Sequence, residues 1–150
     1  NTFMTEIFNA FQSYANIKHI NFTYESNFRY MNVWFDKEKM ESILKNIISN
    51  ALKYTPENGN VQIFVSENND SWSVEVKDTG IGIPKDSLKK IWERFYKTDL
   101  SRGKDKRGTG LGLSIVKEII QAHGENINCI STEGVGTEFI FTLPIAKDKE

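Results

Sequence analysis

Asn46 and Asn50 are spaced by four residues within an apolar, helix-like segment, and Lys53 follows one turn later. At about 100° per residue, these three side chains lie within roughly 60° of one another on one face of a helix. Amide carbonyl oxygens are hard ligands that suit Mg²⁺, an ion that completes its shell with waters and substrate phosphates. The spacing therefore predicts a magnesium-phosphate site, with two solvated amides as the plainer alternative.

A second group follows a strand-like segment, where Asp78 is succeeded by Gly80 and Gly82. Glycine adopts positive φ without strain and lets the backbone come close to a flat ligand. The pattern is compatible with a ligand site, and equally with an ordinary turn between a strand and a helix.

Residues 96–110 form the longest polar, glycine-bearing stretch of the chain. Between residues 97 and 107, five Lys or Arg residues stand against two Asp residues, so the local charge is +3. Loops of this length inside a domain are typically functional. We expect a lid that orders over phosphates, the alternative being a solvated run of charges.

Three glycines, Gly108, Gly110 and Gly112, then lead into another helix-like segment. The N-terminus of a helix attracts anions, because its N–H groups are unpaired and its dipole is positive there. The Gly-x-Gly-x-Gly spacing differs from the dinucleotide-binding fingerprint, no initial βαβ unit places it, and the Lys-Ser/Thr pair of a P-loop is absent. The glycines therefore predict a phosphate site of another kind.

Hydrophobic periodicity predicts the elements that position these groups. Helices are expected at residues 3–17, 40–54, 85–95 and 111–123, and strands at residues 21–25, 32–35, 61–65, 72–77, 127–131 and 138–143. Asp36 is expected to cap the helix that carries Asn46 and Asn50. The strands at 61–65 and 72–77 form a hairpin that we place centrally in a sheet.

The composition is that of one domain, with 150 residues and 39% hydrophobic residues; we assign it to residues 1–146, followed by a charged tail at 147–150. The net charge of -1 gives no global attraction to nucleic acid or to an anionic membrane. No apolar run approaches 18 residues, and the single cysteine, Cys129, favours a reducing compartment. The chain starts at Asn1 directly in a helical pattern, so we expect a piece of a longer protein.

Taken together, the blocks resemble the ATP-binding catalytic domain of sensor histidine kinases, within the superfamily shared with gyrase, Hsp90 and MutL. The resemblance covers essentially the whole chain. It lies in an N box at residues 43–54, a G1 box at 78–82, an F box at 91–95, a G2 box at 108–113 and a last glycine motif at 134–137. It implies a two-layer α/β sandwich, in which helices cover one face of a mixed sheet and ATP lies between the helices and the lid.

The resemblance also implies roles for individual residues. Asn46 and Asn50 would bind Mg²⁺, Lys53 would contact the phosphates, and Asp78 would accept a hydrogen bond from the adenine amino group. The adenine slot would be completed by Tyr54, Gly80, Gly82, Ile83, Leu113 and Thr137, the last supporting Asp78 through an ordered water. The phosphates would be held by Gly108, Thr109, Gly110, Leu111 and Gly112, and Arg94 would stabilise the γ-phosphoryl group with the lid cations.

The implied function is to bind Mg-ATP and to donate the γ-phosphoryl group to a histidine on a separate dimerisation domain of the same parent. His19 and His123 lack the surroundings of that acceptor. A response regulator would act downstream, and we expect a cytoplasmic domain, without direct membrane or nucleic-acid contact, of a membrane-anchored parent. The alternatives are an ATP-gated conformational switch, a serine kinase of the anti-sigma type, or an interaction module without nucleotide. Glu125, where such kinases often have glycine, leaves open the shape of one turn.

Overall fold

The computed structural model describes residues 2–26, 37–67, 71–88, 90–92 and 112–144. Its helices are α1 (Thr2–Lys18), α2 (Lys37–Tyr54) and α4 (Gly112–Ala122), with one short 3₁₀ helix, η1 (Lys85–Ser87). Its strands are β1 (Asn21–Ser26), β2 (Asn60–Glu67), β3 (Ser71–Asp78), β4 (Ile127–Thr132) and β5 (Gly136–Pro144). The predicted strand at 32–35 and the cap at Asp36 lie outside the described residues.

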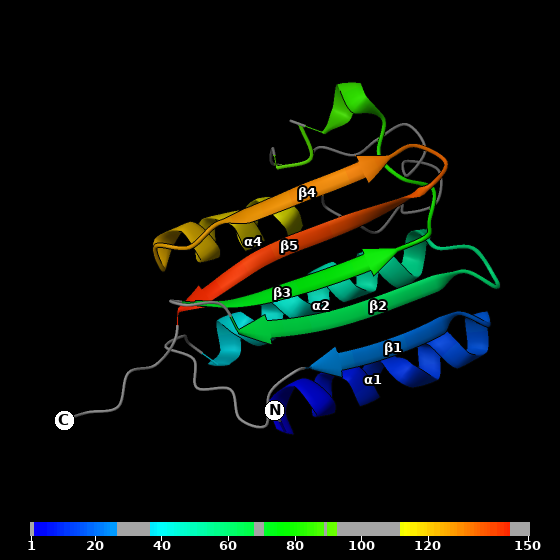
Figure 1. The fold of residues 1–150 in the computed structure, drawn as a ribbon, viewed down its shortest axis with the longest axis horizontal. Coiled ribbons are helices and arrows are strands. Elements are labelled where there is room, and N and C mark those ends of the chain that lie inside the picture. The colour runs from blue at the N-terminus through cyan, green and yellow to red at the C-terminus, as the bar shows by residue number, and fades with distance from the viewer. Residues whose placement is uncertain (1, 27–36, 68–70, 89, 93–111, 145–150) are drawn as a thin grey trace.

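The five strands form one mixed sheet in the order β1-β2-β3-β5-β4. β1 and β2 are parallel, whereas the other neighbours pair antiparallel. Helices α1, α2 and α4 all lie behind the sheet in Figure 1, so they cover one of its faces. This two-layer α/β arrangement, with β2 and β3 in the interior of the sheet, confirms the expected fold class.

The core lies between the helices and the covered face of the sheet. Along β2, Val61, Ile63 and Val65 are buried, while the residues between them are half-buried. This alternation is the period of two that a strand with one covered face must show. Helix α2 buries one apolar stripe against the sheet: Met40, Ile43, Leu44, Ile47, Ile48 and Ala51.

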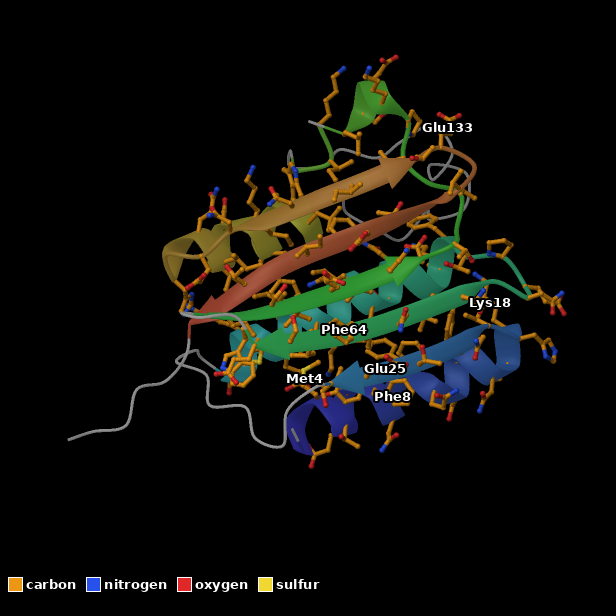
Figure 2. The ribbon with its side chains drawn as sticks, in the orientation of Figure 1. Met4, Phe8, Lys18, Glu25, Phe64 and Glu133 are labelled. Carbon is orange, nitrogen blue, oxygen red and sulfur yellow. The ribbon has the colours of Figure 1, made fainter. Side chains whose placement is uncertain are left out.

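The other face of the sheet carries no helix among the described residues. Glu25 of β1 pairs with Phe64 of β2, and Figure 2 shows both side chains on the face turned toward the viewer. Along β3, Glu75 and Lys77 occupy that face and alternate with the buried valines of the core side. This face is therefore mixed in character, whereas the covered face is almost entirely apolar.

The helix predicted at 85–95 was wrong for the part that the structure describes. Residues 85–87 form a 3₁₀ helix, and turns follow at 88 and 90–92. The N–H of Ser87 donates to the Pro84 carbonyl and the N–H of Lys90 to that of Ser87, both over the tighter three-residue span. The N–H of Ile91 also donates to the Ser87 carbonyl, which is the only four-residue bond among the described residues of this segment. The apolar residues still pack as expected: Ile91 is buried, and the Trp92 ring meets the edge of Phe139 at 6.0 Å.

Candidate functional site

A row of polar side chains runs across three strands, β3, β5 and β4, at one end of the covered face of the sheet. Asp78 of β3 is paired with Thr137 of β5, which is paired in turn with Ser131 of β4. The next row on the same face consists of Val76, Phe139 and Cys129. Because paired residues point to the same side of a sheet, the polar row adjoins the core directly. This is the place where the covered face ceases to be apolar.

The Asp78 carboxylate is only 7% exposed and is held through one oxygen. Its Oδ1 accepts hydrogen bonds from the N–H of Gly80 at 2.8 Å and the N–H of Thr137 at 3.2 Å. No described residue donates to Oδ2, which leaves that oxygen for a further donor. Burial raises the pKa of Asp78, and the two backbone hydrogen bonds partly oppose this rise.

Thr137 contacts Asp78 directly through its backbone. Its backbone N–H reaches the carboxylate directly, and its hydroxyl lies 2.9 Å from the hydroxyl of Ser131. Ser131 also accepts from the N–H of Ile83 at 2.7 Å and donates to the carbonyl of Gly136 at 2.9 Å. Sequence reasoning missed Ser131. The sequence did contain an indication of this residue. Ser131 follows Ile127 and Cys129 at intervals of two residues, so it points to the same, inward side of the strand.

The loop after β3 fits closely between the end of α2 and the β4–β5 turn. The N–H of Ile81 donates to the Tyr54 carbonyl at 3.1 Å, and the N–H of Gly134 donates to the Ile81 carbonyl at 2.7 Å. A Cβ on Gly80 would lie 2.5 Å from the Tyr54 carbonyl oxygen. Gly82 has a φ of 72°, a value that favours glycine. The structure thus brings together six of the residues assigned to the adenine slot: Tyr54, Asp78, Gly80, Gly82, Ile83 and Thr137.

The C-terminal end of α2 is held by the first helix. The ammonium of Lys18 in α1 donates to the carbonyls of Leu52 and Lys53, both at 2.7 Å. The last carbonyls of a helix have no partner within the helix and require one from elsewhere. A cation is also favoured at this end, where the helix dipole is negative. Lys18 therefore fixes the turn of α2 that meets the loop after β3.

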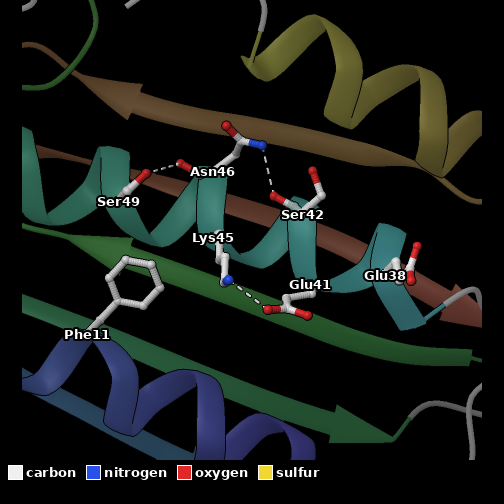
Figure 3. A pocket seen from close by; sticks show the side chains of 7 residues that line it. All are labelled: Phe11, Glu38, Glu41, Ser42, Lys45, Asn46 and Ser49. Atoms are coloured by element: carbon white, nitrogen blue, oxygen red, sulfur yellow. Dashed lines mark hydrogen bonds and ion pairs between the residues drawn. The ribbon is translucent and has the colours of Figure 1, made fainter.

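The predicted metal ligands lie on the partly exposed side of α2. Asn46 donates its amide N–H to the Ser42 carbonyl at 2.8 Å, and Figure 3 shows its amide oxygen turned away from that bond. Asn50 is half-buried, with no partner among the described residues. The ammonium of Lys53 lies 5.5 Å from the centre of the Tyr54 ring. Two neutral amide oxygens and one cation fit the ligand set expected for Mg²⁺ with a polyphosphate.

A hollow of about 490 Å³ runs over the exposed surface of α2. It is lined by Phe11, Glu38, Glu41, Ser42, Lys45, Asn46 and Ser49 (Figure 3). Asn46 is the one predicted site residue in this lining, and the ion pair of Lys45 with Glu41 at 2.7 Å crosses it. The hollow thus meets the predicted magnesium ligands at Asn46 and does not include the row at Asp78.

Several predicted residues are placed only in part. Gly112 is the first residue of α4, and Leu113 packs half-buried against the core. Arg94, Gly108, Thr109, Gly110, Leu111 and the whole predicted lid lie outside the described residues. Within the described ranges, no group of three or more His, Cys, Asp or Glu side chains could hold a metal ion, and no helix is long and apolar enough to cross a membrane.

The turn after α4 accommodates Glu125. Its N–H donates to the Ile120 carbonyl at 3.1 Å, and its carboxylate accepts from the Thr142 hydroxyl. The residue with positive φ here is Gly124, at 75°. One glycine therefore suffices to end this helix.

Comparison with known proteins identifies relatives of this chain. Residues 35–147 match the model of the histidine kinase-, DNA gyrase B- and HSP90-like ATPase family. The sensor histidine kinase WalK of Bacillus subtilis (strain 168) is 44% identical over 150 residues, which are 99% of this chain and 24% of WalK. The chain therefore spans about a quarter of that relative.

Solved structures agree with the family match. The catalytic domain of histidine kinase ThkA superposes with a TM-score of 0.85 at 30% identity, covering 98% of this chain and 95% of that one. ThkA in complex with the response regulator TrrA gives 0.80 at 28% identity, covering 97% and 40%. Full-length ShkA in complex with AMPPNP gives 0.84 at 27% identity, covering 99% and 30%. The resemblance found in the sequence is thereby confirmed, and the chain belongs to the family of histidine kinase-, DNA gyrase B- and HSP90-like ATPases.

Proposed function

We propose that this chain binds Mg-ATP and donates its γ-phosphoryl group to a histidine on a separate helical dimerisation domain of the same parent protein. The observation that carries the proposal is the buried Asp78 carboxylate, with one oxygen held by two backbone N–H groups and the other without a donor among the described residues. It stands at the edge of the core, where it could accept a hydrogen bond from the amino group of a ligand.

Adenine is the base that suits this carboxylate. Its exocyclic amine would donate to Asp78 Oδ2, whereas the carbonyl oxygen of guanine at the same position would face a carboxylate oxygen. Charge-assisted hydrogen bonds of this kind are stronger than neutral ones. Tyr54, Ile83 and Leu113 would contact the base, while Gly80 and Gly82 keep the loop close to it.

The phosphates would lie along α2 toward α4. Asn46 and Asn50 would supply neutral oxygens to Mg²⁺, and Lys53 a positive charge to the phosphates. Mg²⁺, when bound, would neutralise charge on the β- and γ-phosphates. Arg94 and the glycines from Gly108 to Gly112 would act on the transferring group and its neighbours. Phosphoryl transfer needs chiefly this kind of positioning and charge stabilisation.

The acceptor histidine would come from another domain. His19 follows α1, and its carbonyl accepts from the N–H of Asn58 in the turn before β2. His123 lies 2.8 Å from the Ile119 carbonyl at the end of α4. Neither ring belongs to the polar row or to the Asn46 face of α2. The proposed partners are that dimerisation domain and a response regulator, and the domain would lie in the cytoplasm of a membrane-anchored parent. The sensor histidine kinase WalK supports the sensor-kinase context, and the complex of ThkA with the response regulator TrrA supports the second partner.

The decisive experiment mixes this chain, γ-labelled ATP and a separately produced dimerisation domain. We expect acid-labile phosphate on the partner and very slow ATP turnover by the chain alone. Asn50→Ala should weaken nucleotide binding by about 10- to 100-fold and abolish transfer, since substitutions around a metal site typically cost about that much.

Asn128→Ala is the matched control, because Asn128 is an exposed asparagine of β4 on the uncovered face of the sheet. It should bind and transfer like the unmodified chain. Unchanged nucleotide affinity in Asn50→Ala would remove Asn50 from its assigned role. Rapid Mg²⁺-dependent ATP hydrolysis by the pure chain would instead favour an ATP-gated switch.

A further inference from the structure

We propose that Ser131 is a positioning residue that fixes the hydroxyl proton of Thr137 and thereby helps the site to reject purines with an oxygen at the 6-position. The inference rests on the proposed function, because it concerns the base that the same site would bind. Ser131 belongs to none of the family boxes identified in the sequence and enters the site only through the pairing of β4 with β5.

The direction of the hydrogen bonds follows from counting protons. A serine hydroxyl has one proton to donate and two lone pairs to accept with. The Gly136 carbonyl can only accept, so the Ser131 proton is directed to it, at 2.9 Å. The N–H of Ile83 can only donate, so it occupies one lone pair of Ser131, at 2.7 Å. The remaining contact, 2.9 Å to the Thr137 hydroxyl, therefore has Thr137 as the donor.

This arrangement decides what Thr137 can offer to a ligand. Its single hydroxyl proton is committed to Ser131, so its oxygen faces the site as an acceptor. The neighbouring Asp78 carboxylate, when ionised, is also an acceptor only. The polar row therefore presents acceptors alone. An exocyclic amine is matched by these acceptors, whereas a 6-oxo group meets no donor in the row.

Loss of the Ser131 hydroxyl would release the Thr137 proton. The Thr137 hydroxyl could then rotate and donate to a 6-oxo group, which is the interaction that the intact row forbids. A ligand that leaves a buried polar group without a hydrogen-bond partner binds much more weakly. Whether Thr137 donates or accepts can therefore decide between a 6-amino and a 6-oxo purine. A residue that acts only on stability would change the affinity for both kinds of purine alike.

The test measures the affinities of Mg-ATP and Mg-ITP by titration calorimetry, since inosine differs from adenosine in its 6-oxo group and the protonation of the ring beside it. We expect the unmodified chain to prefer ATP. In Ser131→Ala the preference for ATP over ITP should fall by about ten-fold, the size of one lost neutral hydrogen-bond distinction. Ser131→Thr, which keeps a hydroxyl on the strand, should restore the preference to within about two-fold.

Ser73→Ala is the matched control, because Ser73 is a buried serine at the opposite end of β3. It should leave both affinities unchanged. If the unmodified chain binds no ATP, the proposed function itself fails. If it binds ATP but Ser131→Ala keeps the preference, or weakens both nucleotides equally, the role of Ser131 is refuted while ATP binding stands.

A measurement on the unmodified chain covers the case in which Ser131→Ala does not fold. The Thr137 hydroxyl proton should exchange slowly with water in NMR spectra, because it is donated to Ser131 and the residue is 8% exposed. Exchange at the rate of a free hydroxyl would overturn the assignment.

Discussion

The carboxylate of Asp78 is buried, although an ionised carboxylate is more stable in water. Burial raises its pKa, so the folded chain binds a proton there more readily than the unfolded chain does. Its contribution to stability is consequently lost as the pH rises from the ordinary carboxyl pKa through the raised one. At neutral pH, Asp78 therefore lowers the free energy of unfolding.

Asp78→Asn should relieve this cost, since an amide oxygen can accept from the N–H groups of Gly80 and Thr137 as the carboxylate does. We expect the melting temperature at pH 7 to rise by a few degrees, at about 2–4 °C for each kcal/mol in a domain of this size. The difference from the unmodified chain should vanish in acid, where Asp78 is protonated. Affinity for ATP should fall by at least about ten-fold, because an NH₂ group would then face the adenine amine.

Thermal melts at several pH values and calorimetric titrations with Mg-ATP would check both halves of this prediction. An Asp78→Asn chain that is less stable at pH 7 would contradict the stated cost of burial. One that binds ATP undiminished would contradict the assigned role of Asp78.

Single site residues could be predicted from the sequence only where the residues that form the site are close together in the chain. Asp78, Gly80 and Gly82 stand within five positions of one another, so their spacing marked them as candidates, with an ordinary turn as the equal alternative. Ser131 is linked to Ile83 and Thr137 across strand pairings that are not written in the local sequence. The hydroxyl therefore became visible only with the register of β4 against β5.

At the scale of elements, the contact of α1 with the end of α2 joins two segments 34 and 35 residues apart. Lys18→Met keeps the aliphatic stem but removes the donor to the Leu52 and Lys53 carbonyls. We expect the free energy of unfolding to fall by about 1.5–3 kcal/mol, which is the range for hydrogen bonds that involve a charged group. Chemical denaturation followed by circular dichroism would measure it.

Lys45→Met is the control for this change. Lys45 forms an ion pair with Glu41 four residues earlier, both side chains being well exposed, and such pairs contribute only about 0.3–0.5 kcal/mol. Equal losses in the two variants would show that Lys18 contributes no more than an ordinary surface charge.

Helices and strands were predicted well where a long periodic pattern existed. The expected helix at 40–54 is observed as Lys37–Tyr54, because its apolar stripe packs fully against the sheet. The segment after Pro84 was misjudged because its apolar residues, Ile91 and Trp92, anchor turns to the core as well as they would anchor a helix. Apolar spacing over so few residues does not distinguish the two.

For the whole molecule, the one-sided layering predicts unequal tolerance of the two sheet faces. Ile63 of β2 is 1% exposed on the covered face, whereas Ile140 of β5 is half-buried on the uncovered one. Ile63→Ala should cost about 2–5 kcal/mol through lost burial and the cavity left behind. Ile140→Ala, the same chemical change in another interior strand, should cost less than about 1.5 kcal/mol. Urea unfolding would compare them, and a larger loss at Ile140 would contradict the layering.

The arrangement of the sheet could be predicted from the sequence only as a class. The two hairpins, β2–β3 and β4–β5, follow from turns between adjacent strands. The parallel pairing of β1 with β2, and the placing of β5 beside β3, join segments far apart in the chain. Such pairings depend on how α1, α2 and α4 pack together, which no local pattern encodes.

The six residues of β1 determine how a shortened version of the chain would behave. The family match begins at residue 35, so a piece cut to residues 35–147 would lack both β1 and α1. It would lose the stacking of Phe8 on Phe22 at 4.5 Å, and the eight-residue β2, rich in valine and isoleucine, would become the border of the sheet. A long apolar border with unpaired N–H and C=O groups recruits strands from other chains. Such a piece should form aggregates, whereas a chain that keeps α1 and β1 has β2 paired and should not.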